Sequence, residues 1–228
     1  ALAAGIGERR VMSRHIAPGE LLLDYAAGAL PDGPALAVAL HVALDPEARR
    51  AADRLNAVGG ALMEGEAGVA LDDTALERAL ARLDQAAGEP RALPAPRRPG
   101  FDWAPPPLAP HIHTGMGWRR ILGQFDEIRL DVPGDAYRVS LLRLEPGRGL
   151  PEHKHAGYEY TVCLQGGYTD ETGSYSVGDF AVGPGAQQHE PIADPGEPCI
   201  ALIVVEKPIV LTGPWGRFFN PLVKRGLI

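Results

Sequence analysis

Apolar residues recur three and four positions apart through the first third of the chain, which is typical of amphipathic helices. The pattern predicts helices in "PGELLLDYAAGAL", "PALAVALHVAL", "DPEARRAADRLNAVGGALMEG" and "DDTALERALARLDQAAG". In the fourth segment Leu76, Leu80 and Leu83 fall on one stripe. Residues 13–87 are therefore expected to form a small helical bundle whose own core is marginal, because few residues are available to fill it.

The period then changes. Residues 88–110 are rich in proline and are expected to be an extended linker without a packed core. From about Trp118 onward, short runs rich in β-branched residues alternate with Gly, Pro and Asp. Residues 111–228 are therefore expected to form an antiparallel all-β domain. The predicted fold class is α+β and multidomain, with an N-terminal helical bundle joined to a C-terminal jelly roll.

Composition excludes several classes. The net charge is −7 and the sequence pI is about 5.5, so direct nucleic-acid binding by charge is not expected. The sequence contains no apolar run of membrane-spanning length and no signal-peptide pattern, which favours a cytoplasmic protein without membrane contact. Met12 is a candidate true start, with residues 1–11 as an upstream extension. Cys163 and Cys199 lie in apolar runs and are expected to be buried thiols.

A candidate metal site stands out in "PEHKHAGYEYTVCLQGGY". His153 and His155 share a strand face, Glu159 follows closely, and a hairpin could return His189 to the same point. Three imidazoles and a carboxylate can bind Zn, Fe, Mn or Ni. The alternative is the same fold with a solvated, empty site. His111 and His113 also have this spacing, but without a nearby carboxylate they are expected to be exposed linker residues.

The H-x-H, three residues, Glu, six residues, Gly pattern, followed by the Gly, Pro and His of "GDFAVGPGAQQHEP", resembles the two-motif signature of the cupins. It departs at Ala186, where the cupin pattern has Gly. The resemblance implies a metal-binding jelly roll.

The whole arrangement resembles the ChrR family of zinc-dependent anti-sigma factors. The resemblance lies in "RHIAPGELLLDYAAGAL", in "LNAVGGALMEGEAGVAL" and in "LQGGYTDETGSYSVGD" together with the four metal-site residues. It implies that the helical domain holds an extracytoplasmic-function-type sigma factor inactive, and that the cupin domain responds to an oxidative signal. It also favours zinc as the cupin metal.

The helical zinc motif of that family, H-x-x-x-C-x-x-C with an upstream His, is incomplete in this chain. His41 is present and His15 is a candidate partner, but Asp45 and Ala48 replace the two cysteines. Asp45 is expected mainly to cap the third helix, because Pro46 and Glu47 follow it, with metal ligation as the alternative. A second zinc in the helical domain is therefore doubtful.

Three functions remain open at this point. The favoured one is a non-catalytic anti-sigma factor whose protein partner is a sigma factor, with Leu76, Leu80 and Leu83 as contact surface or, alternatively, as ordinary core. The second is a mononuclear cupin enzyme of the iron-dependent dioxygenase type. The third is a plain binding cupin with a decayed helical appendage. A homodimer through the cupin domain is a further option.

Overall fold

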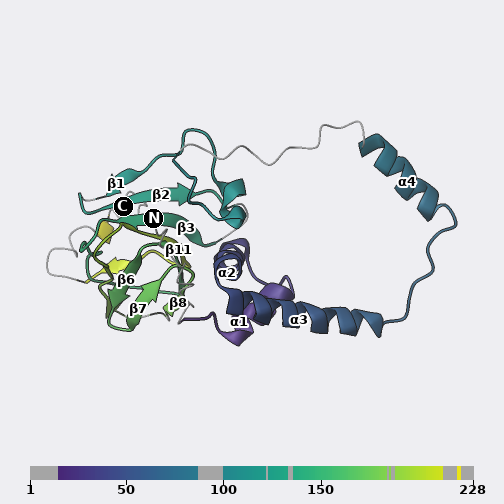
Figure 1. The fold of residues 1–228 in the computed structure, drawn as a ribbon, viewed down its shortest axis with the longest axis horizontal. Coiled ribbons are helices and arrows are strands. Elements are labelled where there is room, and N and C mark those ends of the chain that lie inside the picture. The colour runs from purple at the N-terminus through teal and green to yellow at the C-terminus, as the bar shows by residue number, and fades with distance from the viewer. Residues whose placement is uncertain are drawn as a thin grey trace, which may run out of the picture.

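The structure, a computed structural model, describes residues 15–86, 100–121, 123–132, 136–183, 185, 188–212 and 220–221. The four predicted helices are present as α1 (Gly19–Ala26), α2 (Asp32–Leu44), α3 (Pro46–Glu64) and α4 (Ala75–Ala86), and a 3-10 helix η1 (Pro106–His111) follows (Figure 1). The described strands are β1 (Arg119–Ile121), β2 (Phe125–Leu130), β3 (Arg138–Leu144), β4 (His153–Lys154), β5 (Glu159–Gln165), β6 (Gly167–Asp170), β7 (Gly173–Ser176), β8 (Phe180–Gly183), β9 (Gln188–His189), β10 (Ile192–Ala193), β11 (Cys199–Val205) and β12 (Val210–Leu211).

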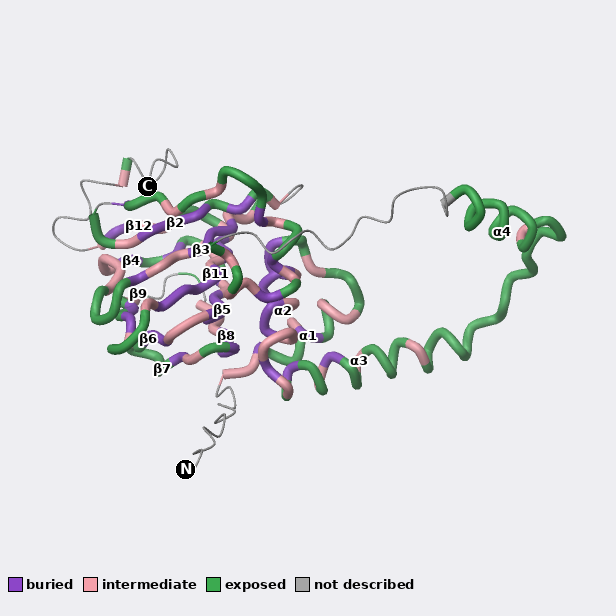
Figure 2. The backbone as a smooth tube through the Cα atoms, turned by 45° about the horizontal axis from the view of Figure 1, so that its top comes forward, coloured by how far each residue is buried: buried purple, intermediate pink, exposed green. Residues whose placement is uncertain are grey.

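The strands form an antiparallel sandwich. One layer is a six-stranded sheet in the order β1-β2-β3-β11-β5-β8. Two three-stranded sheets, β10-β6-β7 and β12-β4-β9, lie across from it (Figure 2). Every pair is antiparallel, and the long strands β3, β11 and β5 lie at the centre, so the predicted all-β architecture is confirmed.

The six-stranded sheet is buried on both faces. Alternate residues of β11, including Leu202 and Val204, join the same hydrophobic core as Leu36 and Leu40 of α2. The residues between them, including Ala201, line a cavity inside the sandwich. This explains the nearly continuous apolar run "CIALIVV", since a strand covered on both sides has no polar face.

The helical region is therefore not a bundle with a core of its own. α1, α2 and α3 pack together, and α2 also packs on β5 and β11. The second half of α3 and all of α4 extend away from this body (Figure 1). Among the described residues, none of the helices has the length and apolar character needed to cross a bilayer.

One expectation for the linker is wrong. Residues 87–99 lie outside the described part of the chain, but residues 100–111 pack instead of extending freely. Leu108 of η1 is fully buried in the main core, where η1 contacts α2. Proline favours the turn of this 3-10 helix, and the apolar Leu108 side chain holds it against the helices.

Candidate metal centre

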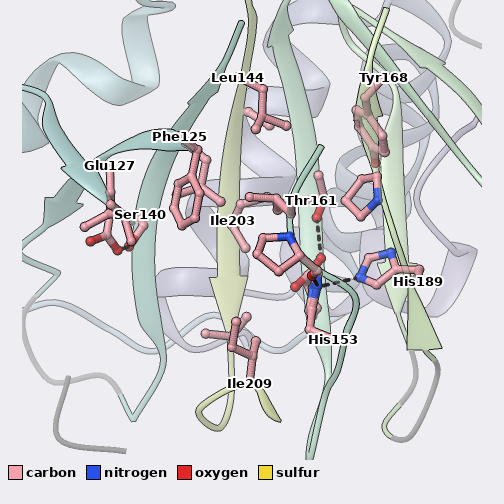
Figure 3. Close-up of a pocket in the computed structure, with 18 of the residues that line it drawn as sticks. Phe125, Glu127, Ser140, Leu144, His153, Thr161, Tyr168, His189, Ile203 and Ile209 are labelled. Atoms are coloured by element: carbon pink, nitrogen blue, oxygen red, sulfur yellow. Dashed lines mark hydrogen bonds between the residues drawn. The ribbon is translucent and has the colours of Figure 1, made fainter. Parts of the chain in front are cut away.

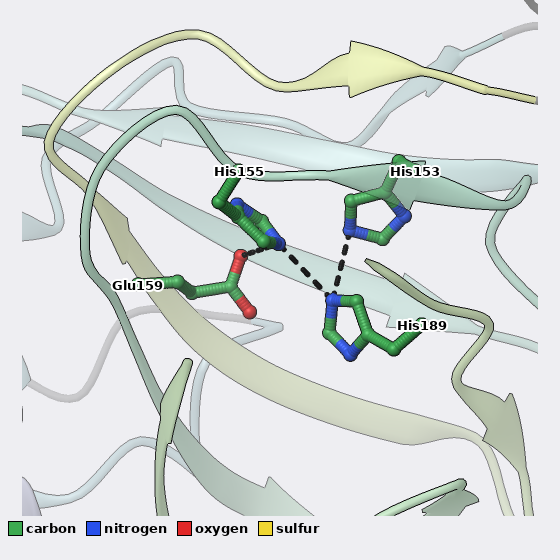
Figure 4. Close-up of side chains that lie close together, drawn as sticks. All are labelled: His153, His155, Glu159 and His189. Atoms are coloured by element: carbon green, nitrogen blue, oxygen red, sulfur yellow. Dashed lines mark hydrogen bonds and ion pairs between the residues drawn. The ribbon is translucent and has the colours of Figure 1, made fainter. Parts of the chain in front are cut away.

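Strand pairing brings the predicted metal-site residues together. β4 and β9 pair with His153 directly opposite His189, His155 follows β4, and Glu159 opens β5. The Nε2 atoms of His155 and His153 lie 3.0 and 3.1 Å from that of His189, and Glu159 Oε2 lies 3.1 Å from His155 Nε2 (Figure 4). One donor atom from each residue lies within 4.8 Å of all the others. Three of the four residues are buried, and His189 is half-buried.

Hydrogen bonds fix which nitrogen of two rings carries the proton. His153 Nδ1 lies 2.8 Å from the Pro151 carbonyl oxygen, and His189 Nδ1 lies 3.1 Å from Asp170 Oδ2. Both partners accept, so both Nδ1 atoms donate. Each neutral ring then presents a lone pair on Nε2, although the two Nε2 atoms are only 3.1 Å apart. A cation between them relieves that repulsion, so this donor set fits a divalent metal.

Asp170, at the end of β6, orients one of the candidate ligands. Burial alone would raise the pKa of this carboxyl, but hydrogen bonds from His189 and Thr172 outweigh it and lower the pKa to about 2. Burial lowers the pKa of His189, but the same hydrogen bond and the negative charges of Glu159, Asp170 and Glu171 together outweigh it and raise the pKa of that imidazole. A carboxylate behind a ligating histidine fixes the ring and increases its basicity. Sequence analysis missed Asp170, because its pairing with His189 depends on the fold.

The other candidate ligands are also in a state that can bind a metal. Burial lowers the pKa of His153 and of His155 to about 4, so both rings are neutral at pH 7. Glu159 Oε1 accepts a hydrogen bond from the Thr161 hydroxyl at 2.9 Å, which leaves Oε2 directed at the cluster. His155 Nδ1 is buried without a partner among the described residues. Its Nε2 is the atom that faces His189 and Glu159.

A cavity of about 130 Å³ adjoins the metal centre inside the sandwich (Figure 3). His153, Glu159 and His189 form part of its wall, and most of the remaining wall is aliphatic or aromatic. At another side lies Glu127, which is held by Arg138 at 2.6 Å and Arg119 at 2.8 Å. Burial raises the pKa of Glu127, but these arginines and a hydrogen bond from Ser140 together outweigh burial and lower the pKa.

The candidate helical zinc residues have other partners. His41 is fully buried; its Nδ1 donates to the Gly178 carbonyl oxygen at 2.7 Å, and its Nε2 accepts from the Ala17 amide at 3.2 Å. Asp45 caps α3, accepting from the Ala48 amide at 2.6 Å, as the sequence predicted. The His15 ring packs on Tyr175 with centroids 4.4 Å apart. Among the described residues, the one group of side chains placed to share a metal ion is His153, His155, Glu159 and His189.

The remaining sequence expectations have mixed outcomes. His113 is exposed and His111 is half-buried at the end of η1. Both cysteines are buried, as expected. Leu76, Leu80 and Leu83 are 71%, 52% and 66% exposed. The alternative expectation, that this stripe packs into a core, is therefore wrong for the chain without a partner. Ala186, where the cupin pattern departs, lies outside the described residues.

Comparisons with known proteins agree with this architecture. The family model described as ChrR cupin-like domain matches residues 108–208. The anti-sigma-E factor ChrR of Cereibacter sphaeroides is 37% identical over 199 residues, which cover 86% of this chain and 91% of that protein. A chain in the crystal structure of Rhodobacter sphaeroides SigE in complex with the anti-sigma ChrR is 36% identical, with a TM-score of 0.72 over 85% of this chain and all of that chain. The chain therefore belongs to the ChrR family of anti-sigma factors.

Proposed function

We propose that the chain is an anti-sigma factor. Residues 13–87 bind an extracytoplasmic-function-type sigma factor, residues 88–110 connect, and residues 111–228 form the sensing cupin domain. The observation that carries this proposal is the similarity, over most of both chains, to a protein crystallised in complex with SigE. No catalytic step is required for this role.

An exposed apolar surface supports the proposal. Val58, Leu62 and Met63 of α3 and Leu76, Leu80 and Leu83 of α4 are all exposed. We call these two sets together the leucine face, although α3 and α4 lie apart in the free chain (Figure 1). Apolar side chains grouped on amphipathic helices that extend from the body usually mark a protein contact. Because sigma factors are the partners of this family, a sigma factor is the occupant that we propose for the leucine face.

We propose that His153, His155, Glu159 and His189 hold one divalent metal, with zinc favoured and iron, manganese or nickel as alternatives. The bound cation would supply a positive centre whose coordination can change by ligand exchange or, if the metal is iron or manganese, by oxidation of the metal. The chain supplies neutral imidazoles, a carboxylate and the Asp170 hydrogen bond that orients His189. We propose that an oxidative signal changes this centre, and that this change releases the sigma factor.

Transcription in a purified system tests the function directly. The full chain is added to core RNA polymerase with each extracytoplasmic-function-type sigma factor of the source organism. Stoichiometric inhibition of one of them is expected, because the leucine face covers surface that the polymerase needs. Transcription that is unaffected with every such sigma factor, by a chain shown to be folded, would refute the proposal.

The cavity beside the metal centre favours a second candidate, a mononuclear metal cupin enzyme. Its volume of about 130 Å³ is close to that of an engineered cavity of about 150 Å³ that binds benzene. A small apolar molecule could therefore reach the metal. The acid–base group on the opposite wall, Glu127, is tied up by two arginines, which disfavours turnover. Product formation by the iron-loaded chain would support the enzyme.

A further inference from the structure

A line of contacts runs along the β6–β7 hairpin, from the metal centre to the first described residue before the helices. His189 Nδ1 lies 3.1 Å from Asp170 Oδ2. Thr172 Oγ lies 2.5 Å from Asp170 Oδ1, and the Tyr175 hydroxyl lies 2.8 Å from Thr172 Oγ. The Tyr175 ring then packs against the His15 ring, with centroids 4.4 Å apart. The β6–β7 hairpin thus contacts His189, which is a candidate metal ligand, and also the segment that leads into α1.

The direction of these hydrogen bonds is determined. The Asp170 carboxylate can only accept, so the Thr172 hydroxyl donates to it. The single Thr172 proton is then committed, and Thr172 Oγ accepts from the Tyr175 hydroxyl. Chains of this kind polarise one another, so a change at one end alters the strength of each bond along it. Tyr175 is buried and stacked on Tyr168, with ring centroids 4.7 Å apart, which restricts its freedom to move independently.

At the other end of the line of contacts, the turn after β7 forms hydrogen bonds with the helical region. The His15 amide donates to Asp179 Oδ1 at 2.8 Å, and the Phe180 amide donates to the His15 carbonyl oxygen at 2.8 Å. His41 of α2 donates to the Gly178 carbonyl oxygen in the same turn. Asp179 is buried and also accepts from the Ser176 amide at 2.6 Å, which ties the turn to β7. A shift of the hairpin is therefore transmitted to the lead-in of α1 and to α2.

The geometry points to the β6–β7 hairpin as the element that couples metal occupancy to the packing of the helices, through Asp170, Thr172, Tyr175 and His15. With metal on its Nε2, His189 is fixed and anchors Asp170. Without metal, the His189 ring is held only by its hydrogen bond to Asp170, the line is anchored less firmly, and the hairpin relaxes away from His15. The consequence for sigma release rests on the proposed function, since α3 carries part of the leucine face and packs on α1 and α2.

Hydrogen–deuterium exchange on the full chain tests the coupling without a sigma factor. The protein is compared with Zn²⁺ bound and after its removal by a chelator, in peptides covering residues 15–45. Coupling between two sites is typically about 5- to 150-fold. Removal of Zn²⁺ should therefore accelerate exchange in these peptides by at least about fivefold. No acceleration in a chain that binds and releases Zn²⁺ would overturn the inference.

Two variants isolate the proposed route. Thr172→Val and Tyr175→Phe each remove one hydroxyl of the line and leave all four candidate metal ligands in place. Both should still bind one Zn²⁺, while the zinc-dependent change in exchange falls to less than about twofold. The matched control is Thr169→Val on the same hairpin, because the Thr169 hydroxyl bonds Ser174 and Asp194 instead of the line. The control should behave as the wild type.

Each outcome is decisive. A wild-type response in both Thr172→Val and Tyr175→Phe overturns the route. If Thr172→Val lost Zn²⁺, Tyr175→Phe, whose hydroxyl is one step further from His189, would decide. A zinc-dependent response that disappears in the variants but not in the control supports the coupling. Sigma binding is measured separately on the same samples, so its absence would refute the proposed function and leave the exchange result standing.

Discussion

Replacing Leu76 with alanine should weaken sigma binding without weakening the fold. The side chain is 71% exposed in the free chain, so little of its burial contributes to folding. Leu→Ala removes three carbon groups worth about 0.8 kcal/mol each when fully buried, or about 2.4 kcal/mol. Burial of the 71% that is exposed would then account for about 1.7 kcal/mol of binding. That corresponds to an affinity loss of about 15-fold.

Adding Leu83→Ala extends the test. Leu83 is 66% exposed, and the same reasoning gives about 1.6 kcal/mol for this residue. If the two effects add, the double variant should bind the sigma factor about 200-fold more weakly. The free energy of unfolding should change by no more than about 0.5 kcal/mol, as at other exposed positions. By contrast, Leu40→Ala in the fully buried part of α2 should cost about 2–5 kcal/mol of stability.

Calorimetric titration with the purified sigma factor, beside urea unfolding of each variant, measures both quantities. Ile192→Ala is the matched control, because Ile192 is an exposed apolar residue on the cupin domain, away from the leucine face. It should leave affinity unchanged. Binding of the double variant within twofold of wild type would refute the assignment of the leucine face. A stability loss above about 2 kcal/mol in the Leu76→Ala variant would show that this side chain is packed in the free protein.

The metal centre and the helices give further expectations. Glu159→Gln removes the anionic donor and should lower zinc affinity by more than 100-fold, since even loss of a group that only orients a ligand costs about 10- to 100-fold; competition with a chelator measures it. Asp170→Asn should fall within that 10- to 100-fold range, and a wild-type affinity would contradict the role of Asp170. The pKa of His189 is raised, so its proton competes with the metal first as the pH falls. Zinc affinity should then begin to drop before the pH has fallen to the ordinary histidine pKa of about 6.5, by about tenfold per pH unit, whereas His153 and His155 compete only near pH 4. A zinc affinity that does not change between pH 8 and pH 5 would refute this. Elemental analysis should find one metal per chain, and two would contradict the assignment of both His41 ring nitrogens to hydrogen bonds with Ala17 and Gly178. His41→Ala should cost about 2–5 kcal/mol of unfolding free energy, because it strands two buried backbone groups.

Local patterns predicted the local structure well. The 3.6-residue period identified the helices, and Asp45 caps α3 as the sequence of Asp, Pro and Glu indicated. The strand runs and the four converging candidate metal-site residues were also readable from the sequence, although β4 and β9 pair across four intervening strands and not as the expected hairpin. The helices and the cap depend on neighbours close in the chain, whereas the metal-site residues were found through their recurring two-motif pattern.

Contacts between distant segments could not be read in the same way. His41 and Gly178 are 137 residues apart, and Asp170 meets His189 only because β6 lies beside β10 and β4 beside β9. One signal was available: "PALAVALHVAL" is apolar around its whole circumference, which indicates a helix covered on several sides. It predicts that α2 lies between the other helices and the sheet, as the shared core around Leu36 and Leu40 shows.

Co-purification with the full chain tests the anti-sigma function most directly. An isolated helical fragment, residues 12–88, is unsuitable for this experiment, because α2 shares its hydrophobic core with the six-stranded sheet. The tagged full chain is therefore expressed in its native organism, and its partners are identified by mass spectrometry. An extracytoplasmic-function-type sigma factor in a 1:1 ratio is expected, and it should be lost from the Leu76→Ala/Leu83→Ala variant. A folded, metal-loaded wild-type chain that recovers no sigma factor would contradict the proposed function.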